Sequence, residues 1–392
     1  MKEANKSYRV DKMSIIVMSI AVVIFFGMLF WLYSEDILKG AGAVFSNHDE
    51  ELVEFEKAAV TEILSEDMKA DKVADGAYTG NQELAVIVGS GRYKGESMVV
   101  YNYFGPNYGV PVSVGDSVTL TIKTHSGGKH SATVYEFNRI PVLAVFLLLF
   151  FVLIIVIGGR TGLKSLAGLI FTAICLFAIL IPLLLKGAPT VLTTFFTCAY
   201  IALVCFTILG GVHRKTISAF LGTVSGAFFA MVFGLAVQFL AKIDGLRLED
   251  AEPLLQLKYA GAQIQLRGLL VAGIIVSALG AVMDVSMSIS SSLEEVHAAN
   301  PALSGRELFK SGMNIGRDLA GTMTNTLILA FLGCEFTLIV FLYARGLTFY
   351  HLFSTAFVAL ETISGLSSSI GMILAIPLTA LISSKLLTRK TV

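Results

Sequence analysis

One carboxylic acid stands alone in an apolar stretch of the chain. Asp284 lies within residues 268–290, a run of mostly small and aliphatic side chains. Glu361 has a similar setting nearer the C-terminus. Because an ionised side chain near the centre of a bilayer costs at least about 2.5–3.5 kcal/mol, such a group is expected to hold a proton, an ion or a charged partner. Asp284 and Glu361 are therefore candidates for binding a proton or a cation.

Polar and small residues accompany these acids at helical spacing. Side chains three or four positions apart share one face of a helix, and three such faces each contain a carboxylate. The functional interpretation is a polar cavity or ion path between three helices, and the alternative is ordinary helix packing by small residues and hydroxyls. We favour packing for the serines and glycines and function for Asp284 and Glu361. The faces comprise Gly273, Ser277, Gly280, Asp284, Ser288 and Ser291; Asp318, Thr322, Asn325 and Thr326; and Ser354, Glu361, Ser364, Gly365 and Ser368.

Three other charged residues carry competing interpretations. Arg317 and Asp318 stand just before the apolar run 319–343. An acid is stabilised at a helix N-terminus, and an arginine can anchor a helix at the headgroups, which is the account favoured here. Glu335 lies about 100° around the helix from the Asp318 face and is either interfacial or a further ion-binding candidate. The complete candidate set is Asp284, Glu361, Asn325, Asp318, Arg317, Ser288 and Glu335.

A different repeat of small residues predicts packing without chemistry. Ser218, Gly222, Gly226, Ala230 and Gly234 recur every four residues in the run 217–240. Small residues at this spacing let two helix backbones approach closely. We therefore expect a packing ridge here.

The composition is that of a polytopic membrane protein. Of 392 residues, 55% are hydrophobic and only 15% are charged, whereas soluble domains average about 25% charged residues. The sequence contains no His-Glu-x-x-His zinc motif and no Walker lysine loop, and no basic, aromatic-rich surface that would indicate nucleic-acid binding. We expect a non-enzyme with the lipid bilayer as partner, and without cofactor, metal or nucleic acid.

Eight apolar runs predict eight membrane spans, since about 20 residues suffice to cross a bilayer. Lys and Arg favour the cytoplasmic side. With the N-terminus inside, the inner segments hold 14 of these residues and the outer loops, leaving out the exterior domain, hold 6. Both termini are then cytoplasmic. The last run exceeds the length of a span, so we expect tilting or unwinding around Ser364 to Gly371. The expected spans are residues 13–32, 141–157, 165–185, 189–209, 217–240, 268–290, 319–343 and 351–383.

A polar segment separates the first two expected spans. Residues 33–139 carry 16 acidic and 9 basic side chains, a net charge of −7, which suits the exterior side. Alternating apolar residues between glycine-containing turns predict a small five-stranded, OB-like β-barrel. Residues 34–56 are expected to be a linker. The expected strands are 58–64, which also fits a helical face, and 83–90, 96–103, 117–123 and 131–137. The domains are thus 1–33, with the anchor span, 34–139, with the barrel, and 140–392, a seven-span bundle.

Several motifs resemble those of bacterial YibE/F-type membrane proteins. They include Tyr93-Lys94-Gly95-Glu96 in the β-domain, Asn314-Ile315-Gly316-Arg317-Asp318 and Ser369-Ile370-Gly371. The resemblance implies an N-terminal anchor, an exterior β-domain, a helical bundle and a place in the bacterial plasma membrane. Such proteins often show two adjacent acids in the sixth span. This chain has Met283-Asp284 there, which argues against a two-carboxylate metal site.

Two functions are favoured over a third, a membrane enzyme that uses intramembrane carboxylates. In the first, the chain is a permease or secondary transporter of a small solute or ion, with Asp284 and Glu361 binding a proton or cation and Asn325 lining the route. Because the sequence has no ATP-binding segment, coupling would come from an ion gradient or a partner. In the second, the chain is a scaffold or envelope regulator whose exterior β-domain binds a protein partner. A water-filled cavity reaching Asp284 would favour the first function.

Overall fold

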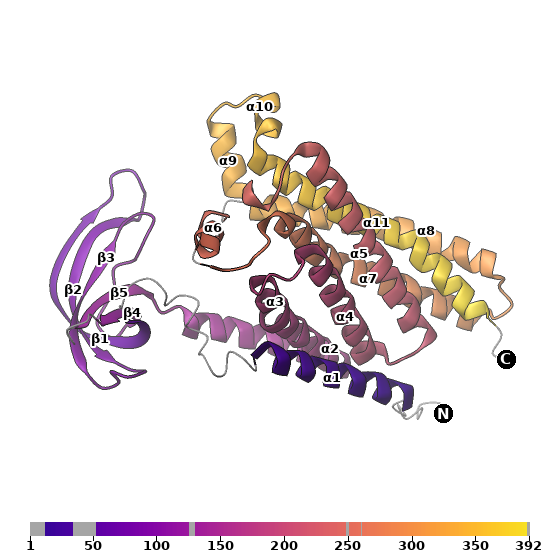
Figure 1. The fold of residues 1–392 in the computed structure, drawn as a ribbon, viewed down its shortest axis with the longest axis horizontal. Helices are drawn as coiled ribbons and strands as arrows, with labels where there is room; N and C mark the ends of the chain where they lie inside the picture. The colour runs from indigo at the N-terminus through magenta and orange to yellow at the C-terminus, as the bar shows by residue number, and fades with distance from the viewer. Residues whose placement is uncertain (1–11, 34–51, 125–129, 248–250, 260, 390–392) are drawn as a thin grey trace. The chain divides into compact units, whose positions relative to one another are not determined.

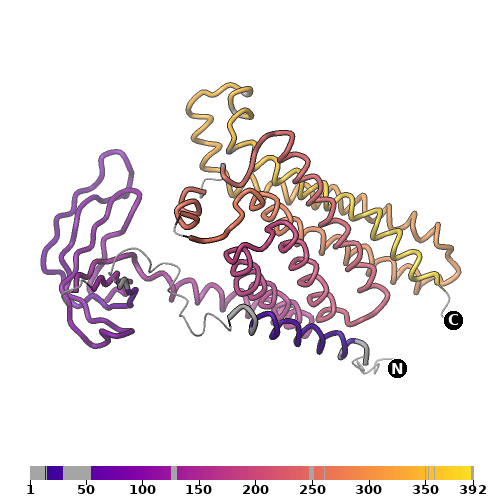
Figure 2. Tube along the Cα trace, in the orientation of Figure 1, coloured from indigo at the N-terminus to yellow at the C-terminus, as the bar shows by residue number. Residues whose placement is uncertain are grey.

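The structure is a computed structural model that describes residues 12–33, 52–124, 130–247, 251–259 and 261–389. The chain forms two compact units, Gly40–Leu153 and Met1–Lys39 with Ile154–Val392. The first contains a closed β-barrel and the second is helical (Figure 1, Figure 2).

Five strands close the barrel in the order β1-β2-β3-β5-β4. All pairings are antiparallel except the short parallel contact of β3 with β5, at Tyr101 and Thr133. Register shifts after Val60 and after Ile63 let β1 curve and pair with both β2 and β4. The arrangement is the OB-like barrel that the alternating runs predict. The strands are β1 (Leu52–Ala70), β2 (Tyr78–Val88), β3 (Ser97–Phe104), β4 (Ser117–Thr124) and β5 (His130–Phe137).

The barrel interior combines an aliphatic core with two buried amides. Alternate residues of β2, β3 and β4 point inward, so that Leu84, Val100 and Leu120 are fully buried. Gln82 bonds both backbone groups of Val112, and Asn102 donates to Gln82 Oε1 at 3.1 Å. These bonds satisfy the buried amides and tie the segment after β3 to the barrel.

All five predicted strands are present, but β1 extends beyond the expected 58–64 at both ends and β2 begins at Tyr78, before the expected residue 83. The segment 58–64 is a strand, but β1 begins at Leu52, so residues 52–56 belong to the barrel and not to the linker. Pairing of Leu52 with Thr124 explains the extension. The rest of the expected linker, residues 34–51, lies outside the described residues.

A fragment of residues 52–139 should fold alone, because its core is internal to the barrel. We expect β-type circular dichroism and one cooperative thermal transition. Leu84→Ala should destabilise the fragment by about 2–5 kcal/mol, as is usual for a buried leucine, whereas Val99→Ala, at an exposed position, should change little. Equal melting temperatures for both variants would contradict this core.

The helical unit contains long apolar helices joined by short segments. Among the described residues, five helical stretches are long and apolar enough to cross a membrane, and a sixth results if α8 and α9 count as one bent span. The helices are α1 (Lys12–Tyr33), α2 (Ile140–Ile174) continuing through a π-helical turn (Cys175–Leu180) into α3 (Ile181–Leu185), α4 (Thr190–Gly210), α5 (Arg214–Ala241), α6 (Ala251–Tyr259), α7 (Leu269–Ala299), α8 (Gly305–Cys334), α9 (Phe336–Ala344), α10 (Phe349–Ser354) and α11 (Ala356–Thr388).

The chain turns sharply inside α2, where two separate spans were expected. Gly159 has φ 54° and ψ −131°, a conformation that favours glycine. A side chain at Gly162 would collide with the backbone of Ile154, which shows that the chain folds back on itself at this point. The turn lies between the expected spans 141–157 and 165–185.

The C-terminal helices differ from the expectations in two ways. The helix that contains the expected seventh span begins well before residue 319, at Gly305, where Ser304 and Glu307 form a capping box. The same stretch is broken at Glu335, with a 64° bend between α8 and α9. Of the two alternatives for the last span, local unwinding does not occur, since α11 is helical throughout and Gly371 allows close contact with Ala230 of α5; tilting stays a prediction.

Candidate functional site

Hydroxyl groups join α7 to α11 along their common length. Residue numbers rise in the same direction on both helices, which therefore run parallel, as the sixth and eighth spans should. Hydroxyls that bond one another hold helices together, so they leave no open path at these positions. The pairs are Ser277 with Ser368 (2.8 Å), Thr379 with Ser286 (3.2 Å) and Ser290 with Ser383 (3.1 Å).

The small-residue ridge of α5 packs against the same two helices. All five of its residues are buried. A Cβ at Gly226 would lie 2.6 Å from Val282 Cγ1 and 2.8 Å from Ala375 Cβ, so only glycine permits this approach. Gly222 lies beside Thr379 of α11, and Gly226 lies beside Ala375. Residue numbers therefore fall along α11 as they rise along α5, so the two helices are antiparallel. The ridge has the packing role that its spacing predicts.

Asp284 lies on the face of α7 that the bundle leaves open. Gly273, Gly280 and Asp284 are exposed, while Ser288 is half-buried. Among the described residues, the Asp284 carboxylate has no hydrogen-bond or ion-pair partner. Asp284 nevertheless follows Ser277 and precedes Ser286, both of which contact α11. Its depth is therefore that of the apolar helices, and its direction is outward.

Arg317, Asp318 and Asn325 also point outward, from α8. The preceding residue, Gly316, packs against Ile376 and Ile289 of the apolar core. Asp318 lies more than three turns beyond the helix start, too far for the N-terminus to stabilise it, because that effect is confined to the first turn. The expected N-terminal role of Asp318 is therefore wrong. The expected role of Arg317 as a headgroup anchor stays a prediction.

Glu335 and Glu361 come close together, which the sequence did not indicate. Glu335 terminates α8 at the bend, and Glu361 lies one and a half turns into α11. Both are half-buried, and Glu335 is near enough for its charge to act on Glu361. Glu335 is thus the neighbour of one candidate acid.

Contacts among the described residues join the three predicted faces only in part. The serines of α7 and α11 meet, and Glu361 meets Glu335, but no contact among the described residues joins Asp284 to Asp318 or Asn325. Ser354 belongs to the separate helix α10. Among the described residues, no group of three potential metal ligands is present.

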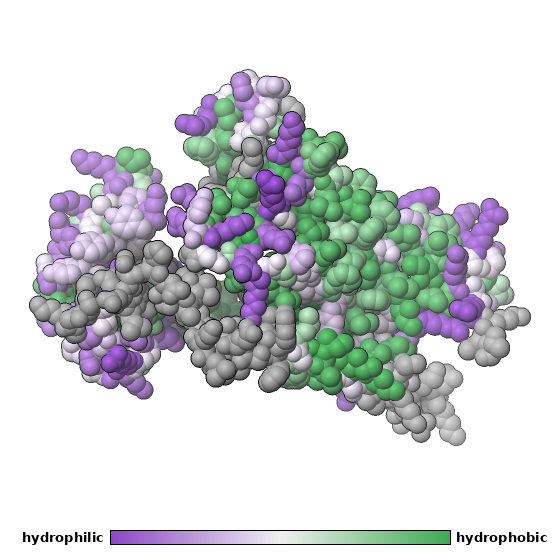
Figure 3. Space-filling view, viewed as in Figure 1, coloured by the Kyte–Doolittle hydropathy of each residue, from purple (hydrophilic) through white to green (hydrophobic). Residues whose placement is uncertain are grey.

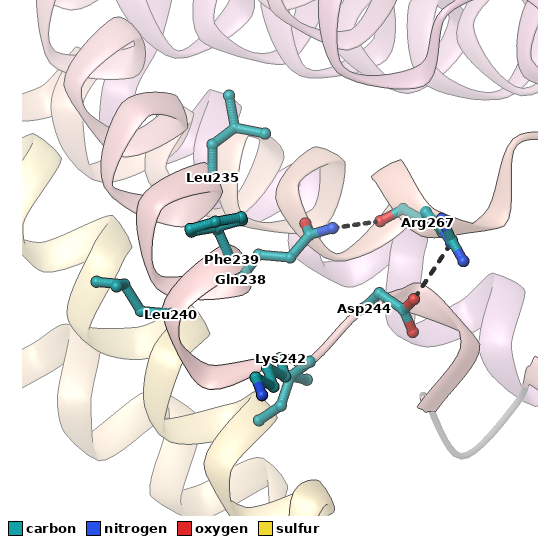
Figure 4. A pocket seen from close by; sticks show the side chains of 8 residues that line it. Leu235, Gln238, Phe239, Leu240, Lys242, Asp244 and Arg267 are labelled. Carbon is teal, nitrogen blue, oxygen red and sulfur yellow. Dashed lines mark hydrogen bonds and ion pairs between the residues drawn. The ribbon is translucent and has the colours of Figure 1, made fainter.

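A recess that the sequence did not predict lies at the end of α5 (Figure 4). Its volume is about 890 Å³. Gln238 Nε2 donates to the carbonyl oxygen of Arg267 at 3.1 Å, and the Arg267 guanidinium lies 3.5 Å from the Asp244 carboxylate. These contacts fasten the loop after α5 to the start of α7. The lining residues are Leu235, Gln238, Phe239, Leu240, Lys242, Ile243, Asp244 and Arg267.

These features define a mostly helical protein that combines a closed five-stranded barrel with helices of membrane-spanning length. Residues 146–389 match the family described as YibE/F-like protein. The match covers more than half of the chain, so the protein belongs to this family, as its motifs indicated. Comparisons with curated proteins and with solved structures give no match.

Proposed function

We propose that this protein is a multi-span protein of the bacterial plasma membrane that transports a small solute or ion, with both termini in the cytoplasm. The observation that carries the proposal is the position of Asp284, at the depth of the apolar helices and without a partner among the described residues. An ionisable group at such a position is costly unless it binds a proton, an ion or a substrate.

The surface of the helices supports the membrane assignment. Figure 3 shows hydrophobic side chains over much of the visible face of the helices, with hydrophilic ones gathered near their ends. Large apolar residues such as Phe196 and Phe239 are 65% and 83% exposed, which water would disfavour and lipid would accept. An ion pair between Lys215 and Glu294, at 2.7 Å, lies where α5 begins and α7 ends. Apolar helices with polar ends are the pattern of a bundle crossing a bilayer.

The transport proposal adds a role for the acids. Asp284 would bind the proton or cation, and Glu361 with Glu335 would form a second acidic position where the helix bends between α8 and α9. Broken helices near ion-binding groups are typical of secondary transporters. Each acid would release its ion when the path opens to the other side.

The test is uptake by the purified full-length chain in proteoliposomes. A panel of small solutes and ions should be screened under imposed pH and sodium gradients, with protein-free liposomes as the control. We expect at least one solute to accumulate only when protein and gradient are both present. Uptake that never exceeds the protein-free control over the whole panel would contradict transport.

The barrel surface favours the second function, a partner-binding scaffold. Tyr101 and Tyr103 are exposed, and their rings stack with centroids 6.2 Å apart. Tyr101 donates a hydrogen bond to Glu83 at 3.2 Å, and the negative charge of Glu83 raises the pKa of the Tyr101 hydroxyl. Exposed tyrosines are common anchors in protein interfaces. If no solute is taken up, the alternative is tested by capture of an envelope protein on the full-length chain. Loss of that capture in the Tyr101→Ala, Tyr103→Ala double variant would support the scaffold function.

A further inference from the structure

Helix α8 has one packed face and one polar face that the described bundle leaves open. The packed face brings Gly312 and Gly316 against α7 and α11. On the opposite side, a Cβ added at Gly321 would meet nothing within 4 Å. The polar face of α8 consists of the exposed residues Asn314, Arg317, Asp318, Gly321, Thr322 and Asn325.

This polar face extends into the depth of the bundle. Gly316 packs against Ile376 of α11. Ile376 precedes Lys385, a basic residue near the expected cytoplasmic end of α11, by about 13 Å of helix at 1.5 Å per residue. Asn325 lies about 13 Å deeper still along α8. The long side chain of Arg317 can reach back toward water, but the short side chains of Asp318 and Asn325 cannot. Contact with lipid at this depth is unfavourable for both.

The described part of the chain offers few hydrogen-bond or ion-pair partners for the residues of this polar face. Arg317 Nη1 donates to Asn314 Oδ1 at 3.1 Å, within the same face. For the Asp318 carboxylate and the Asn325 amide, the described part of the chain offers no hydrogen-bond or ion-pair partner. Both groups therefore need a partner from outside.

We propose that a second copy of this chain covers the polar face, α8 against α8, around a twofold axis along the membrane normal. This inference rests on the membrane assignment above, but not on transport. Two copies in one membrane have the same orientation, so their α8 helices run parallel and equal residue numbers meet at equal depth. The interface is then self-complementary, as twofold symmetry demands.

The charges of the face fit this arrangement. Arg317 and Asp318 differ by about 100° around the helix and 1.5 Å along it, so they lie on opposite sides of the centre of the face, with Arg317 at its edge. Across a parallel twofold pair, Arg317 of one copy faces Asp318 of the partner subunit, as charged edge residues do in parallel coiled coils. Gly321, between the edges, permits close approach of the two backbones. Asn325 lies near the centre of the face, where the two amides can bond each other.

Charge exchange tests this pairing in the full-length protein. In lipid nanodiscs, the parent should show a concentration-dependent dimer by single-molecule photobleaching. Arg317→Asp alone places only acids at the contact, and Asp318→Arg alone places only bases there. Each should weaken the dimer about tenfold or more, because it leaves buried charges unpaired. The combined exchange Arg317→Asp, Asp318→Arg should restore dimers. Failure of the combined exchange to restore them would overturn the pairing.

Cysteine cross-linking gives a second, independent test that folding defects do not confuse. Cys334, which is exposed, is first replaced by serine. Gly321→Cys should then form a disulfide-linked dimer on oxidation, and Leu221→Cys, exposed on α5 next to Gly222 at a similar depth, should not. Equal cross-linking at both positions in a monomeric parent would overturn the proposal. A monomeric parent that holds a lipid or another protein at the polar face would overturn it as well. If the protein forms these dimers but takes up no solute, this inference stands and only the transport proposal is contradicted.

Discussion

Replacing Gly226 with valine should remove most of the folded protein from the membrane. The added Cβ alone would stand 2.6 Å from Val282 and 2.8 Å from Ala375, and 3.0 Å from the carbonyl oxygen of Gly371. These neighbours belong to α7 and α11 and are short side chains or backbone, so they cannot turn aside. Overpacking of this kind costs about 1–3 kcal/mol and sometimes more. Membrane abundance and the melting temperature in detergent should both fall sharply.

Gly280→Val on α7 is the matched control. It makes the same change within a neighbouring helix, with the same intrinsic cost of a β-branched residue, but a Cβ there meets nothing within 4 Å. Its abundance should stay close to that of the parent. If both variants have the same melting temperature, α5 does not pack through Gly226 as the structure shows.

The packing ridge illustrates what could be predicted from local pattern. Small residues repeated every four positions have one plausible use in a membrane helix, and all five of those in α5 are buried. The strands of the barrel were equally predictable, because alternation with a period of two and intervening turns are both local. Their closure into a barrel required only that β1 be long enough to pair on both edges.

The start of α8 is also encoded locally. Ser304 and Glu307 have the spacing of a capping box, and the structure shows both of its bonds. Hydrophobicity alone placed the span from residue 319, since the preceding turns are polar. The helix itself begins at Gly305, so the interpretation of Asp318 as a residue of a helix N-terminus is wrong. A capping motif outranks hydropathy in locating where a helix begins.

Other features depend on partners far apart in the sequence. Glycine and serine between Ser364 and Gly371 fit both an unwound helix and a closely packed one. In the structure Gly371 lies against Ala230 of α5, and Gly365 lies against Phe331 of α8. These contacts between distant segments favour the packed helix. The approach of Glu335 to Glu361 depends in the same way on the bend between α8 and α9. No local pattern gives the angle of a bend.

Asp284→Asn should abolish solute uptake and leave the amount of folded protein nearly unchanged. The amide resembles the carboxylate in shape, but it cannot release a proton or neutralise a cation. Because Asp284 has no partner among the described residues, its loss breaks no contact within the described bundle. Uptake in proteoliposomes should fall to the protein-free background, while membrane abundance and melting temperature stay at the parental level.

Two further variants separate function from structure at this position. Asp284→Leu removes the polar group entirely, and an outward-facing apolar residue at this depth should be tolerated or should stabilise the fold, because burying an ionisable group in lipid is costly. It should therefore be abundant and inactive. Glu295→Gln makes the same chemical change as Asp284→Asn at an exposed position near the end of α7, so it should keep parental uptake. If Asp284→Asn and Asp284→Leu both transport like the parent, Asp284 is not the ion-binding group and the transport proposal loses the observation that carries it.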